Sequence, residues 1–242
     1  MRLIFQVFLL VFAVVLGGLI VDLLSSFNQK KIIKTLLAFS GGFLLAIAFA
    51  HFLPELYDNH SEKIGIYVLV GFLIQLFLEY FSGGIEHGHV HHHHHTHKFP
   101  WVLFISLSIH SFIEGIPLSL PSDILHKSRF HSDISLLMGI LFHQVPVAIA
   151  LMTVLKQAAY AKIKSWFILF AFSLMTPMGL IIGYFTQGKI NLVNMNYLLA
   201  IVMGMFLHIS TTIIFETNEN HKFNLIKLTS ILVGVILALF LN

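Results

Sequence analysis

The sequence predicts an all-α integral membrane protein, a bundle of eight transmembrane helices with both termini outside. Of its 242 residues, 57% are hydrophobic and only 10% are charged, and the mean hydropathy is +0.88. A soluble domain carries about 25% charged residues. A chain of this composition cannot hide its apolar surface from water by folding on itself, so we expect a bilayer to cover it.

Eight apolar runs supply the predicted spans, because a membrane helix needs roughly 17–25 residues. The first run resembles a secretory signal, but it is about 20 residues long and no small-x-small cleavage site follows it, so we interpret it as a retained span. The third and eighth runs are the shortest, and polar connections separate all of them. The runs lie at about 3–25, 35–57, 64–82, 99–120, 133–155, 165–186, 193–216 and 223–241.

Basic residues orient the predicted bundle, because cytoplasmic connections of membrane proteins are rich in Lys and Arg. With the N-terminus outside, the inner connections hold Lys30, Lys31, Lys34, Lys98, Lys156, Lys162, Lys164, Lys222 and Lys227. The outer side then holds Arg2, Lys63, Lys127, Arg129 and Lys189. This distribution favours both termini outside.

No composition shift marks a domain boundary, so we expect one transmembrane domain over residues 1–242. We expect this domain to be multi-pass in the plasma (inner) membrane.

The connection at 83–98 is low in complexity and contains "EHGHVHHHHHTHK". A run of imidazoles binds divalent metals through interchangeable contacts, although a solvated spacer remains the alternative. An expression tag would sit at a terminus, whereas this run is internal. The histidines are His87, His89, His91, His92, His93, His94, His95 and His97. Because the chain has no cysteine, any metal site must use nitrogen and oxygen ligands.

Glu114 is the one acid deep within a predicted span, whereas Asp22, Glu79 and Glu216 fall near predicted interfaces. An ionised carboxylate in the bilayer centre is costly, so such a residue usually marks a functional path. His110 precedes Glu114 by four residues, which places both side chains on one helix face. Imidazole nitrogen and carboxylate oxygen together suit zinc and similar divalent ions.

The next run carries a second mid-span histidine, His143, followed by Gln144 and Pro146. Two such histidines on consecutive helices can converge on one ion. Pro146 and Pro117 each lack an N–H and therefore free the carbonyl four residues earlier, which then needs a partner. Kinking of packed helices is the plainer interpretation of either proline alone.

Five stretches, in this order, resemble one known family: "GGFLLAIAFAHFLPELYD", "VGFLIQLFLEYF" before the histidine-rich loop, "HSFIEGIPL", "HQVPVAIAL" and "LMTPMGLIIG". The chain resembles the ZIP (Zrt/Irt-like) family of divalent-metal transporters over most of its length. Eight spans, outward termini and an inward histidine-rich loop after the third span are also what that family shows.

The resemblance implies metal coordination midway through the membrane by the fourth and fifth spans. The family's ligand positions fall on His110, Ser111, Glu114, His143 and Gln144. Two departures stand out: Val147 and Thr176 occupy positions where many or some members have an acid. We therefore expect a single ion rather than a two-metal centre bridged by carboxylates.

The predicted function is import of divalent transition metal ions into the cytoplasm, zinc first, with iron, manganese or cadmium as others. We expect no enzymatic activity and no prosthetic group. The expected partners are the metal ions and the lipid bilayer; a homodimer is left open, and nothing supports nucleic-acid binding. A non-transporting metal sensor or scaffold is one alternative. An intramembrane metallohydrolase is the other, but the chain has no H-E-x-x-H motif.

Overall fold

The computed structural model describes residues 2–23, 29–59, 63–82, 101–119, 131–186, 192–216 and 225–241. The regular structure in these residues is helical throughout, which confirms the predicted all-α class. Seven described segments are long and apolar enough to cross a membrane: Arg2–Leu23, Lys31–Asp58, Ile64–Ser82, Trp101–Ser119, Ile134–Gln157, Lys162–Thr186 and Met195–Phe215. An eighth apolar helix, Leu225–Phe240, is shorter. The eight predicted runs thus correspond to eight helical segments.

Three of these segments change their helical form part-way, and a proline lies at or near each change. The second segment passes from α2 (Gln29–Ile47) through a π-helical turn (Ala48–Phe52) into α3 (Leu53–Asn59). The remaining elements are α1 (Arg2–Leu23), α4 (Ile64–Ser82), α5 (Trp101–Gly115), a 3-10 turn (Ile116–Ser119), α6 (His131–Gln157), α7 (Lys162–Ser173), α8 (Met175–Thr186), α9 (Leu192–Glu216) and α10 (Leu225–Phe240).

The prolines explain these changes, because a proline cannot donate to the carbonyl four residues earlier. Pro54 directly follows the π-helical turn, Pro117 lies in the 3-10 turn after α5, and Pro177 follows the break between α7 and α8. Pro146 lies inside α6, which nevertheless continues to Gln157. α2 also begins at Gln29, earlier than the apolar run at 35–57, because hydropathy marks the apolar stretch and not the helix.

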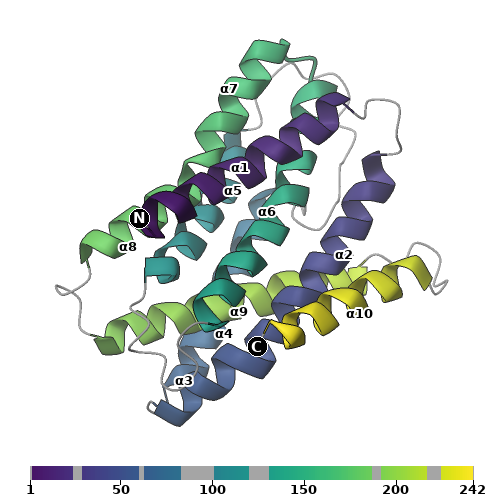
Figure 1. Cartoon of the computed structure of the whole chain (residues 1–242). Helices are drawn as coiled ribbons and strands as arrows, with labels where there is room; N and C mark the ends of the chain where they lie inside the picture. The colour runs from purple at the N-terminus through teal and green to yellow at the C-terminus, as the bar shows by residue number, and fades with distance from the viewer. Residues whose placement is uncertain are drawn as a thin grey trace.

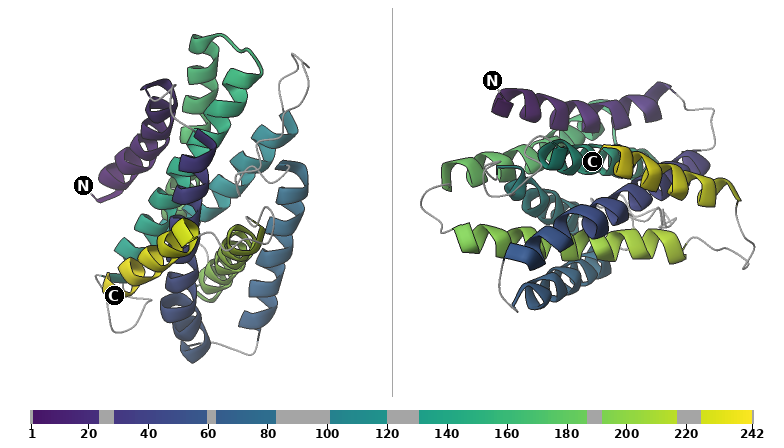
Figure 2. Two further views of the ribbon diagram at one scale, coloured as in Figure 1. Left: turned by 90° about the vertical axis from the view of Figure 1, so that its right-hand side faces the viewer. Right: turned by 60° about the horizontal axis from the view of Figure 1, so that its bottom comes forward.

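The helices pack as two groups (Figures 1 and 2). In the first group α1 packs along α6, and α5 packs along α8; in the second, α2 packs along α10, and α4 packs along α9. Figure 2 shows α1 and α4 on opposite sides of the molecule, with α6 and α2 between them. The two groups meet where α2 contacts α6 and where α4 contacts α5.

Glycines allow the paired helices to approach closely. A Cβ on Gly71 of α4 would collide with the backbone carbonyl oxygen of Ile201 of α9. Tyr67 stacks on Tyr197 in the same interface, with ring centroids 4.1 Å apart. The residue numbers of the two helices rise together, so α4 and α9 run parallel. Small residues at such crossings are the usual means of close helix packing in membranes.

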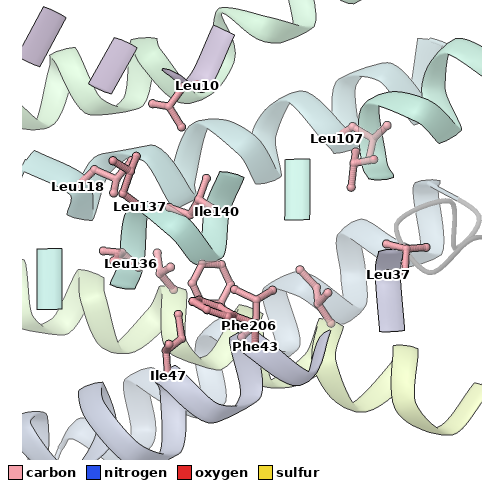
Figure 3. Packing of buried hydrophobic residues seen from close by; sticks show 14 of the residues in the cluster. Leu10, Leu37, Phe43, Ile47, Leu107, Leu118, Leu136, Leu137, Ile140 and Phe206 are labelled. Carbon is pink, nitrogen blue, oxygen red and sulfur yellow. The ribbon is translucent and has the colours of Figure 1, made fainter. Parts of the chain in front are cut away.

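Large apolar side chains fill the interior and also cover the outside. Leu10, Phe43, Leu107, Ile140 and Phe206 belong to one buried cluster (Figure 3). Exposed apolar residues on the outer faces include Phe5, Phe8, Phe77, Phe167 and Phe240. A soluble protein rarely exposes so many large apolar side chains, and a lipid-facing surface requires them.

A polar cluster ties the C-terminal end of α1 to the junction of α6 and α7. Asp22 Oδ1 lies 2.6 Å from Lys156 Nζ, and Asp22 Oδ2 lies 3.0 Å from Lys162 Nζ. Trp166 Nε1 donates to Asp22 Oδ2 over 3.0 Å, and Lys156 also donates to the carbonyl of Val21. Asp22 therefore binds three groups of the neighbouring helices.

Candidate metal site

α5 carries the two residues at the centre of the candidate site. His110 and Glu114 are each 1% exposed, and His110 Nε2 lies 3.3 Å from Glu114 Oε2. They stand one helical turn apart on one face of α5, within the apolar segment Trp101–Ser119. Ser111 is also buried in α5.

The spacing of the two atoms fits tetrahedral metal coordination. Nitrogen and oxygen ligands lie about 2.0–2.2 Å from Zn²⁺, so two ligands of a tetrahedral ion are about 3.3–3.5 Å apart. The Nε2–Oε2 distance of 3.3 Å matches this separation. The separation of these two atoms is thus compatible with one zinc-sized ion between His110 and Glu114.

α6 brings two further predicted residues to the same place. The buried ring of His143 lies edge-on to that of His110, with centroids 5.8 Å apart and an interplanar angle of 80°. Gln144 Nε2 donates to Glu114 Oε1 over 3.2 Å. Gln144 Oε1 is buried and accepts no hydrogen bond from the described part of the chain, so it offers a neutral oxygen ligand.

Thr176 of α8 joins this network. Gln144 Nε2 donates to Thr176 Oγ1, and Thr176 Oγ1 donates to Glu114 Oε1 over 3.5 Å. From the sequence, Thr176 stands out only as a position where some members of the resembled family have an acid. Its place before Pro177 in an apolar run is the one signal that could have suggested a role. Val147, the other departure, is a buried core residue.

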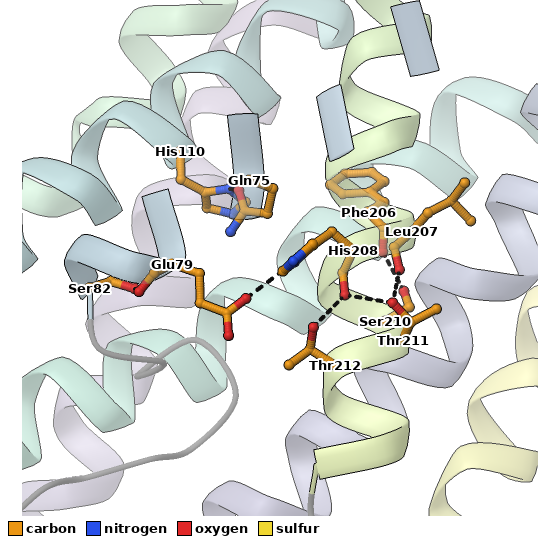
Figure 4. A network of polar contacts seen from close by, with 10 residues as sticks. All are labelled: Gln75, Glu79, Ser82, His110, Phe206, Leu207, His208, Ser210, Thr211 and Thr212. Carbon is orange, nitrogen blue, oxygen red and sulfur yellow. Dashed lines mark hydrogen bonds and ion pairs between the residues drawn. The ribbon is translucent and has the colours of Figure 1, made fainter. Parts of the chain in front are cut away.

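Gln75 of α4 contacts the site from the second helix group. Its side chain is fully buried, and its Oε1 lies 2.9 Å from His110 Nδ1 (Figure 4). Gln75 is a polar side chain within an apolar span, but the sequence alone does not indicate its partner. Its significance depends on α4 lying against α5, which the sequence does not reveal.

A second His–Glu pair joins α4 to α9, and its glutamate lies one helical turn after Gln75 on α4. Glu79 Oε2 lies 3.2 Å from His208 Nδ1 of α9, and the two side chains are 16% and 5% exposed (Figure 4). From the sequence, Glu79 is expected near a membrane interface. Glu79 is mostly buried and is paired across the α4–α9 interface, three residues before α4 ends at Ser82.

These side chains stop short of a closed metal cage. In the described ranges, no group of three or more His, Asp or Glu residues is arranged to hold a metal ion. His110 Nε2 and Glu114 Oε2 lie 3.3 Å apart, and the ring of His143 lies beside that of His110. The predicted histidine-rich loop at 83–98, with all eight of its histidines, lies outside the described residues.

Comparison with known proteins identifies what the chain is similar to. The family model described as ZIP Zinc transporter matches residues 2–100 and 85–242, which together cover nearly the whole chain. A comparison with individual curated proteins finds no match.

Proposed function

Since the chain belongs to the ZIP zinc transporter family, and is therefore a multi-pass membrane metal transporter, we propose that its cargo passes through the His110–Glu114 site. The observation that carries this proposal is the 3.3 Å separation of His110 Nε2 and Glu114 Oε2 in a buried setting. This separation equals the distance between two nitrogen or oxygen ligands of a tetrahedral Zn²⁺ ion, so the two buried groups suit a divalent cargo.

His143 is the third proposed ligand. Gln144 Oε1, the hydroxyl of Ser111 or a water completes the coordination shell of the ion. Glu114 is the only carboxylate among these residues, and its neighbours Gln144 and Thr176 are neutral. One carboxylate neutralises only half the charge of a divalent ion, so the site holds one ion and can release it.

The direction of transport is inward. Helices of the two groups move relative to each other, so that the site opens first to one side and then to the other. The distribution of basic residues supports both termini outside and the histidine-rich loop inside, where it receives the ion. The membrane is the plasma (inner) membrane, and a homodimer is the assembly that an oligomeric-state measurement should test first.

Zinc is the preferred ion, with iron, manganese and cadmium as competitors. A mixed imidazole and carboxylate site favours zinc over harder ions such as magnesium or calcium. Uptake of zinc in the presence of each competitor ranks the ions directly.

The proposal is tested by zinc uptake into proteoliposomes that hold the purified protein. We expect uptake by the parent and its loss in His110→Ala and Glu114→Ala. Parent-like uptake by these two variants would show that the site lies elsewhere.

A non-transporting metal sensor or scaffold is the second candidate. The neutral residues Val147 and Thr176, where many or some members have acids, favour it. Metal binding by the parent protein without flux across the bilayer would decide for it.

A further inference from the structure

We propose that Gln75 is a positioning residue: it holds His110 in the tautomer and orientation that present Nε2 to the metal ion. This inference rests on the proposed function, in which His110 is a ligand. It adds a residue from α4, a helix outside the proposed ligand set.

The hydrogen bond defines the protonation of the ring. His110 Nδ1 lies 2.9 Å from Gln75 Oε1, and both side chains are buried. An amide oxygen only accepts hydrogen bonds, so Nδ1 must carry the proton that it donates. A neutral imidazole has one N–H, so Nε2 then carries a lone pair.

That lone pair points to the place where an ion is expected. Nε2 lies 3.3 Å from Glu114 Oε2. A lone pair and a carboxylate oxygen repel each other at this distance, and a cation between them makes both contacts favourable. Gln75 therefore prepares the pair for a cation, in the way that a second-shell acceptor orients a metal-binding histidine.

The hydrogen bond also joins the two helix groups. Gln75 lies on α4, which packs along α9, whereas His110 lies on α5, which packs along α8. A shift of one group along the other separates Gln75 from His110. The imidazole then loses the acceptor that fixes its tautomer. The affinity of the site for the metal ion therefore falls as the site opens to the other side of the membrane. Gln75 thereby links release of the ion to the conformation of the bundle.

The experiment measures Co²⁺ and Zn²⁺ binding to purified full-length variants in detergent. Gln75→Met removes the acceptor at similar length, Gln75→Glu keeps an acceptor, and Gln6→Met makes the same change at a buried glutamine of α1. We expect Gln75→Met to weaken binding about 10- to 100-fold and to change the visible spectrum of bound Co²⁺. Gln75→Glu should keep most of the affinity that Gln75→Met loses, because a carboxylate also accepts from Nδ1, and Gln6→Met should bind like the parent.

Two results would overturn the inference. One is parent-like affinity and Co²⁺ spectrum in Gln75→Met. The other is an equal loss in Gln75→Met and Gln75→Glu, which would show that only the packing of glutamine matters.

The binding assay separates this inference from the proposed function. If His110→Ala binds and transports like the parent, the proposed site fails. If His110→Ala is defective while Gln75→Met behaves like the parent, the site stands and only the role of Gln75 fails. In proteoliposomes, Gln75→Met should raise the KM for zinc more than it lowers kcat, because the ligand is still present.

Discussion

Replacing Glu114 by glutamine changes the charge of the candidate site and almost nothing of its shape. Gln144 and Thr176 both donate to Glu114 Oε1, and the amide oxygen of a glutamine can accept both bonds. The amide nitrogen of the glutamine then takes the place of Oε2, which lies 3.3 Å from His110 Nε2. There it donates a hydrogen bond to the lone pair of His110 Nε2. Glu114→Gln thus isolates the carboxylate charge from the packing around it.

The expected effects on stability and on affinity differ widely. Because the hydrogen bonds are kept, the free energy of unfolding should change by about 1 kcal/mol at most. In the metal-bound protein, Glu114 and Zn²⁺ form a buried charge pair, and removing one charge from such a pair costs about 3–5 kcal/mol of binding free energy. One factor of ten corresponds to about 1.4 kcal/mol, so Zn²⁺ affinity should fall about 100-fold or more.

The assay combines Zn²⁺ titration with thermal unfolding of the purified protein in detergent. Asp58→Asn, the same change at an exposed acid near the end of α3, is the matched control and should match the parent in both measurements. A Zn²⁺ affinity of Glu114→Gln within about threefold of the parent would refute the reasoning, because that is under 1 kcal/mol. A large loss of stability would refute the claim that the amide fits the network.

Three further predictions concern pH, the α1 junction and the helix pairs. Lowering the pH from about 7.5 to about 5.5 should raise the KM for zinc uptake, because protons compete with metal for imidazole and carboxylate ligands; an unchanged KM would contradict this. Asp22→Asn should lower stability by about 1 kcal/mol, since its lysine partners are 37% and 74% exposed, and thermal unfolding should show the difference shrinking at high salt. Gly71→Ala should destabilise by about 1–3 kcal/mol, because its Cβ meets a backbone carbonyl, whereas Gly65→Ala, which faces only a tyrosine hydroxyl, should unfold like the parent.

The fold class and the central pair could be predicted because both depend on local properties of the chain. Hydropathy alone indicates the spans, and four-residue spacing alone places His110 beside Glu114. Helix ends are harder to predict from hydropathy. For example, α2 begins in a lysine-containing stretch that a hydropathy criterion leaves out of the span.

Gln75 and Thr176 could not be assigned from the sequence for a different reason. Each meets the site only because its helix packs against α5, and nothing in the sequence states which helices are neighbours. A polar residue in an apolar span carries the same local signal whether it faces a site or bonds within its own helix. The resemblance to the ZIP family predicts site residues only at the family's ligand positions, and Gln75 is not one of them.

The glycine contacts between helices are of two kinds, contacts with a neighbour's backbone and contacts with its side chains. Within each pair, glycines rest on the partner's backbone, as Gly71 does on Ile201. Between the groups, Gly139 of α6 instead faces the side-chain ends of Ile47 and Leu44 of α2. A backbone contact interlocks two helices, whereas side-chain ends can change rotamer and let one helix slide. The side-chain contact at Gly139 therefore leaves room for one group to slide along the other, and the hydrogen bond from Gln75 to His110 crosses the same boundary.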